Sequence, residues 1–313
     1  MKYLTFQIFC FFISIQIVQA QQIDITLPHF AGKEFSFSLP QGLRSDTIVR
    51  SILDKDGKAT IVIPERYRNY RGMGHFRMVN GGGLDLVVAG ESFSVNCMEE
   101  QPSINNVHIM NSSENTFVTE QFRKSNELKQ KKQLSDAAVL VYTKATLFGR
   151  QAIKEQQRLR WQIAKQDSLL QHSTLYAARF LRLQQYLDDV ANAYRKTPEE
   201  IEVLRQYGVK SLDMEALFTS GLWYHVLDYW TAMYRDYVKE DNAFPEDVVA
   251  IMKRIKNQKV FEEFSDDIAS ICEQNKWNHT EYAIADYLLQ SGRADNTTNY
   301  RLINLMQDRK SVV

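Results

Sequence analysis

The stretch "TIVRSILDKDGKATIVI", residues 47–63, decides the fold of the first third of the chain. Apolar and polar residues alternate over residues 47–52 and again over residues 59–63, and Asp54-Lys55-Asp56-Gly57 separates the two runs. Alternation with a period of two is typical of strands, and an Asp-Gly turn between two such runs is typical of a hairpin. The stretch therefore predicts two antiparallel strands joined by a tight turn.

The segments around this stretch have the same strand-like texture. Residues 23–27 and 35–39 alternate, and the glycine-rich stretch "VNGGGLDLVVAGESFSV", residues 79–95, continues into β-branched runs. A phosphate-binding loop or a nucleophile elbow would need a helix after its glycines, so these glycines are interpreted as turns between strands. Several short strands at this spacing predict an antiparallel sandwich or sheet over residues 21–118.

Beyond about residue 120 the pattern becomes helical. Apolar residues recur at spacings of three and four, beginning with Leu134, Ala138, Val141, Ala145 and Phe148. A capping box at residues 197–200 with Gly208 as its stop, and a similar signal at residues 278–281 with Gly292 as its stop, predict two further helices. The fold class is therefore α+β, with an antiparallel β-rich domain followed by an irregular helical domain over residues 119–313.

The first 20 residues have the features of a secretory signal peptide. A basic start at Lys2 precedes an apolar run over residues 8–17, and the segment closes on Val18-Gln19-Ala20. We expect cleavage after Ala20, export to the periplasm or beyond, and no later membrane span.

The overall charge is close to neutral, with one local exception. Removing Lys2 with the leader leaves 37 basic residues (38 − 1) against 38 acidic ones, which gives no general reason to expect nucleic acid or an anionic membrane as a partner. Residues 123–165 contain 11 Lys and Arg but only Glu127, Asp136 and Glu155 as acids. This bias could attract nucleic acid or an anionic surface. An exposed helix face is the simpler interpretation, because glutamines are interleaved and export removes most nucleic-acid partners.

Two cysteines remain in the mature chain, Cys97 and Cys272, separated by 175 positions (272 − 97). There is no CxxC pair, which is the usual centre of thioredoxin-type redox chemistry. Each cysteine continues an apolar face, so we expect buried thiols, although a redox role stays open as an alternative. The sequence suggests no cofactor and no metal site.

The segment "SGLWYHVLDYW", residues 220–230, carries the other weak candidates. Trp223 belongs to an apolar helical face and is interpreted as core, with ligand contact as the alternative. His225 and Asp228 lie three residues apart and could form a polar pair for hydrolysis, which is the weakest hypothesis. The acids Glu262, Glu263, Asp266 and Asp267 are interpreted as the solvated side of a helix.

The order of several segments resembles the accessory N-terminal region of secreted TlpA-like thiol–disulfide oxidoreductases. These segments are "LDKDGKATIVIPERYRNYRGM", "NSSENTF", "STLYAARF", "SGLWYHVLDYW" and "YLLQSGR", and the resemblance covers about residues 23–293. In that family a thioredoxin domain with its CxxC follows the accessory region, whereas this sequence ends at Val313. The resemblance therefore assigns no catalytic residue here.

The resemblance and the missing redox centre together favour an exported, non-catalytic binding or interaction protein. The alternative is a split or truncated component of a periplasmic oxidoreductase that acts with a separate thioredoxin-fold partner. We expect the partner to be a thioredoxin-fold or other envelope protein.

Overall fold

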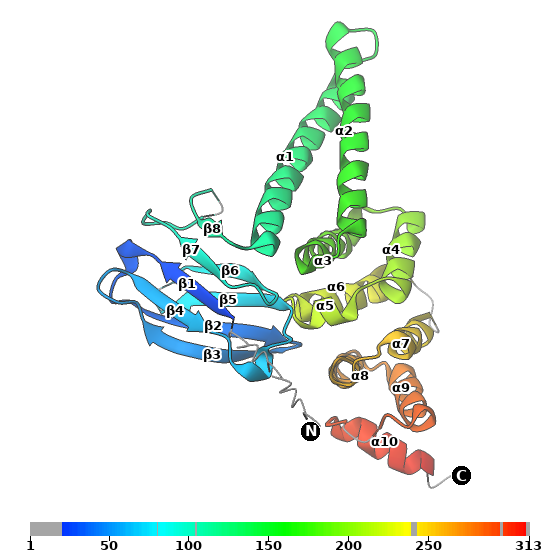
Figure 1. The fold of residues 1–313 in the computed structure, drawn as a ribbon. Coiled ribbons are helices and arrows are strands. Elements are labelled where there is room, and N and C mark those ends of the chain that lie inside the picture. The colour runs from blue at the N-terminus through cyan, green and yellow to red at the C-terminus, as the bar shows by residue number, and fades with distance from the viewer. Residues whose placement is uncertain (1–20, 80, 104, 239–242, 295–296, 311–313) are drawn as a thin grey trace, which may run out of the picture.

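The computed structural model describes residues 21–313 except 80, 104, 239–242, 295–296 and 311–313. The expected signal peptide therefore lies outside the described residues. In the described part, strands come first and helices follow, which confirms the α+β fold class (Figure 1).

The strands form two four-stranded sheets that share one core. One sheet has the order β4-β1-β7-β8 and the other the order β3-β2-β5-β6. The strands are β1 (Gln22–Thr26), β2 (Glu34–Gln41), β3 (Arg44–Ile52), β4 (Lys58–Val62), β5 (Gly72–Met78), β6 (Gly83–Val88), β7 (Phe93–Asn96) and β8 (His108–Met110). All strand pairs are antiparallel except β1 with β7, which are parallel.

The predicted hairpin over residues 47–63 is wrong, because its two strands belong to different sheets. β3 pairs with β2, whereas β4 pairs with β1. The turn itself forms, since the Asp54 carboxylate accepts hydrogen bonds from the main-chain nitrogens of Asp56 and Lys58, both at 2.8 Å. The chain crosses from one sheet to the other here, and Leu53, just before the turn, is buried in the core between them.

Gly57 is required at this crossing for two reasons. Its φ of +72° lies in the left-handed region that favours glycine. Its carbonyl oxygen accepts a hydrogen bond from the Leu27 nitrogen at 2.8 Å, so a Cβ at this position would collide with the Leu27 main chain. The crossing thereby ties the turn to the end of β1.

The helices lie beside one end of the β-sheets and extend away from it (Figure 1). They are α1 (Ser113–Val141), α2 (Leu147–His172), α3 (Tyr176–Ala191), α4 (Pro198–Lys210), α5 (Met214–Phe218), α6 (Trp223–Met233), α7 (Ala243–Arg254), α8 (Gln258–Asn275), α9 (Asn278–Ser291) and α10 (Tyr300–Lys310). A π-helical turn, Tyr234–Val238, follows α6. The helical core includes Met73 of β5, Val87 of β6 and the following Ala89, so this end of the two strands packs against the helices.

Local helix signals were partly right. The capping box of Thr197 and Glu200 is present, and Gly292 ends α9 with a φ of +66°. Gly208, however, lies inside α4, where the absence of a side chain makes room for Tyr186 and Trp230. At α9 the capping position is Trp277, not Asn278, and no side chain caps that end.

None of the helices in the described residues is both long and apolar enough to cross a bilayer.

Candidate functional site

The most distinctive feature is an antiparallel pair of long helices, α1 and α2, which extends from the rest of the molecule (Figure 1). We call it the helical hairpin, residues 113–172. Side-chain hydrogen bonds hold its two arms together: Ser135 donates to the Ala152 carbonyl at 3.0 Å, and Gln156 donates to the Asp136 carboxylate at 2.7 Å. The apolar stripe predicted to run from Leu134 to Phe148 is interrupted here by the loop between the arms.

The end of the helical hairpin carries large apolar side chains that contact water. Leu140 is 88% exposed and Val141 is 74% exposed. We call this end the tip and define it by the exposed apolar residues Leu140, Val141, Tyr142, Leu147 and Phe148. Isolated exposed apolar residues are ordinary, but a contiguous group at a projecting end is typical of an interaction surface.

The tip has a defined turn. The Thr146 hydroxyl caps α2 by accepting from the Gly149 nitrogen at 3.0 Å, and the rings of Tyr142 and Phe148 meet edge to face with centroids 4.7 Å apart. Gly149 lies against the Thr143 carbonyl oxygen, with which a Cβ would collide. The apolar side chains are therefore presented by a closed loop whose backbone is hydrogen-bonded.

The arms carry the basic residues that the sequence places between 123 and 165. Three acids of this segment are paired within their own helices, as Glu127 with Lys131, Asp136 with Lys132 and Glu155 with Arg158. Near the tip, Lys144, Arg150 and Lys154 form no ion pair with any carboxylate of the described residues. The end of the helical hairpin therefore combines exposed apolar groups with unneutralised cations.

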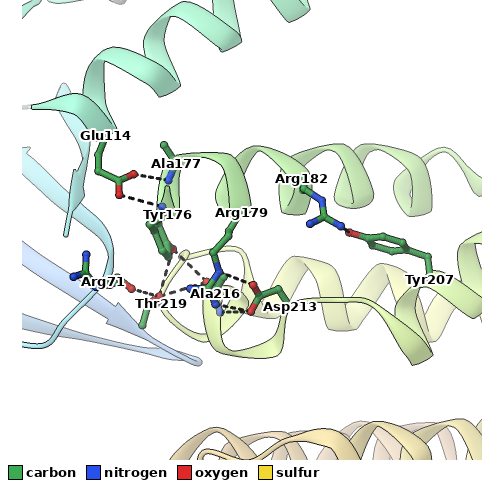
Figure 2. A network of polar contacts seen from close by, with 10 residues as sticks. All are labelled: Arg71, Glu114, Tyr176, Ala177, Arg179, Arg182, Tyr207, Asp213, Ala216 and Thr219. Atoms are coloured by element: carbon green, nitrogen blue, oxygen red, sulfur yellow. Dashed lines mark hydrogen bonds and ion pairs between the residues drawn. The ribbon is translucent and has the colours of Figure 1, made fainter. Parts of the chain in front are cut away.

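The base of the helical hairpin is tied to both sheet and helices. The Asn115 amide pairs with the main chain of Val87 in β6, accepting from its nitrogen at 2.8 Å and donating to its oxygen at 2.9 Å. The carboxylate of Glu114 accepts from the nitrogens of Tyr176 and Ala177 at the start of α3, at 3.1 and 2.7 Å (Figure 2). Because both side chains are buried, these bonds are shielded from water.

The same network continues across the helices to Arg71, the residue before β5. The Tyr176 hydroxyl donates to the Ala216 carbonyl at 3.2 Å, and the Thr219 hydroxyl donates to the Arg71 carbonyl at 2.8 Å (Figure 2). Arg179 forms a two-pronged ion pair with Asp213 at 2.6 and 2.8 Å. Burial would raise the pKa of Asp213, but hydrogen bonds from Arg179 and from the Ala216 nitrogen hold it below its usual value. The polar groups of this network bind one another, so we interpret the network as a structural joint between the base of the helical hairpin and the rest of the molecule.

A groove of about 320 Å³ lies where the helical hairpin meets the sheet. Its lining is mainly apolar and comes from β6, β8, α1 and α3, including Leu84, Ile109, Phe122 and Phe180. Asp85 lies at this groove, but its carboxylate is already bound by His75 at 2.7 Å and by Arg77 at 2.5 Å.

The two cysteines are free and belong to different cores. Cys97 is buried between the sheets, whereas Cys272 is buried among the helices. Burial and the nearby Glu281 raise the pKa of the Cys272 thiol to about 12, so it stays protonated at neutral pH. A disulfide between the two residues would require the cores to unfold.

The candidates of residues 220–230 do not form one site. Trp223 is fully buried, and its ring nitrogen donates to Asp267 at 2.6 Å. His225 and Asp228 are exposed on α6, and the structure shows no hydrogen bond or ion pair between them within the residues it describes. Among all the residues that the structure describes, no group of three or more His, Cys, Asp and Glu side chains is arranged to hold a metal ion.

The interpretation of the acids of α8 as solvated was wrong for Glu263, Asp266 and Asp267. Glu263 reaches the sheet, where it pairs with Arg44 at 3.6 Å, and Asp266 accepts from the Thr298 nitrogen at 2.9 Å. Burial raises the pKa of Asp267 to about 7, opposed by the Trp223 hydrogen bond and reinforced by the charges of Glu263 and Asp266. The spacing of the acids along α8 could not predict these contacts, because their partners Trp223, Arg44 and Thr298 come from distant segments of the chain.

No family model, curated protein or solved structure matches this chain.

Proposed function

We propose that this protein is an exported, non-catalytic binding protein whose binding element is the tip of the helical hairpin. The observation that carries the proposal is the group of exposed apolar side chains at a closed, projecting turn. Exposing this surface is unfavourable by about 25 cal/mol per Å² unless a partner covers it. The resemblance to the accessory region of TlpA-like oxidoreductases favours a non-catalytic role in the cell envelope.

The buried joint at the base supports the same function. Glu114 and Asn115 fix the first turn of α1 to α3 and to β6, so the arms project in a set direction. A binding element held in place loses less conformational freedom when its partner arrives. The alternative, a component of a split thiol–disulfide oxidoreductase, would place the reactive thiols on the partner, because both thiols here are buried.

The test measures binding of the purified protein to an isolated Gram-negative envelope fraction, in the presence of a reagent that traps mixed disulfides. The variant Leu140→Gln/Phe148→Gln should bind at least about tenfold more weakly, because it removes two of the five exposed apolar side chains that define the tip. Val203→Gln is the matched control, since Val203 lies on α4 and is 67% exposed, between Phe148 at 56% and Leu140 at 88%. Equal binding by the tip variant, or no binding by the wild type, would contradict the proposal.

A further inference from the structure

The charge of the molecule is distributed unevenly between the helical hairpin and the rest. The helical hairpin, residues 113–172, carries 11 bases and 6 acids, a net charge of +5 (11 − 6). The whole chain has 38 of each, so the remainder carries 27 bases and 32 acids, a net of −5 (27 − 32). Near an anionic surface this arrangement would turn the helical hairpin toward the surface and the body away from it.

The apolar groups and the cations are also ordered along the axis of the helical hairpin. The apolar side chains of the tip flank the connecting loop, with Lys144 within that loop. Arg150 and Lys154 follow in α2, about 5 and 10 Å behind its first residue at a rise of about 1.5 Å per residue. Amphipathic elements at a bilayer surface bury their apolar groups by about 5–10 Å, with Lys and Arg at the level of the lipid headgroups.

From this order we infer that the tip docks on an anionic phospholipid surface. The apolar side chains enter the boundary between headgroups and acyl chains, and Lys144, Arg150 and Lys154 contact the lipid phosphates. The tip is a convex end, which fits a deformable lipid layer, and its cations lack carboxylate partners within the described residues. The inference rests on the proposed function, since it names the partner class of the same surface.

Lipid docking is tested by flotation of the purified chain from Gln21 onward with vesicles that contain no protein. Starting at Gln21 removes the apolar segment over residues 8–17, which could itself enter the vesicles. Vesicles of equal parts phosphatidylglycerol and phosphatidylcholine should carry the protein upward, and added salt should weaken this binding. Vesicles of phosphatidylcholine alone should bind it far less.

Two sets of variants separate the contributions of the tip. Leu140→Gln/Phe148→Gln should lower the partition coefficient at least about tenfold. Lys144→Gln/Lys154→Gln should lower it by about 25-fold on anionic vesicles only, at about fivefold for each cation. Val203→Gln and Lys256→Gln, two exposed positions outside the helical hairpin, should leave it unchanged.

Lipid docking is wrong if the wild type does not float with anionic vesicles, or if the tip variants float equally well. Binding to the envelope fraction without binding to vesicles would identify a protein partner instead. In that outcome the proposed function stands and the lipid inference falls. If binding to the envelope fraction does not depend on the residues of the tip, both the proposed function and the lipid inference are wrong.

Discussion

Asp267 is a carboxyl group that the fold holds against the Trp223 ring nitrogen, between the charges of Glu263 and Asp266. Its pKa rises from 3.8 to about 7, whereas an unfolded chain leaves it near the ordinary value. The folded state therefore binds one more proton than the unfolded state between these two pH values. Its contribution to stability is complete below about pH 4 and is lost as the pH rises through about 7.

We expect Asp267→Asn to be more stable than the wild type at pH 8, because the amide keeps an acceptor for Trp223 and carries no charge. The difference between variant and wild type should grow by about 2 kcal/mol from pH 4 to pH 8, with screening of this half-buried group taken into account. Urea unfolding at several pH values measures it. Comparing the two proteins isolates Asp267 from Glu281, whose pKa is also raised by burial. A difference that stays constant with pH would show that Asp267 does not titrate in this range.

Among the elements, those defined by neighbouring residues followed from the sequence, and those defined by distant residues did not. The capping box at Thr197 depends on residues three apart, so its pattern is visible in the chain. Whether the chain crosses between the sheets at Leu53 depends on which strand β4 pairs with. The alternation of apolar and polar residues would be the same for pairing with β3 or with β1. For the candidate site, the basic composition of residues 123–165 was visible, but the loop that exposes the tip was not. The sequence continues the apolar spacing through that loop.

The turn of the tip allows a test at the level of one element. Gly149 lies in the first turn of α2, and Thr143 lies in the loop before it. Gly149→Ala should disturb the loop, because the added Cβ would collide with the Thr143 carbonyl oxygen. We expect faster hydrogen exchange over residues 142–150 and weaker binding to the envelope fraction, with little change in the midpoint of thermal unfolding. Ala152→Gly, in the same helix but beyond its first turn, is the comparison for a general loss of helix stability. Unchanged exchange in Gly149→Ala would mean that the loop adapts to the added methyl group.

The whole molecule should unfold as one unit, because sheet residues belong to the helical core and Asn115 of α1 is hydrogen-bonded to the Val87 main chain in β6. All four tryptophans lie beyond residue 160, and Cys97 lies in the core between the sheets. In the chain from Gln21 with Cys272→Ala, thiol labelling of Cys97 and tryptophan fluorescence should therefore change at the same urea concentration.

Separate midpoints for the two probes would show that the sheets and the helices unfold independently. Adding Asn115→Ala to the same variant provides the comparison. This change removes both hydrogen bonds between α1 and the Val87 main chain of β6, at a cost of about 1–3 kcal/mol. It should move the two midpoints apart.

The position of β1 has a consequence for the order in which the chain folds. This first strand is an inner strand of its sheet, between β4 and the parallel β7. During synthesis its two edges must wait for residues 58–62 and 93–96 to emerge. A nascent chain that stops before residue 93 therefore has a strand with one open edge, which a chaperone or another growing chain can pair with.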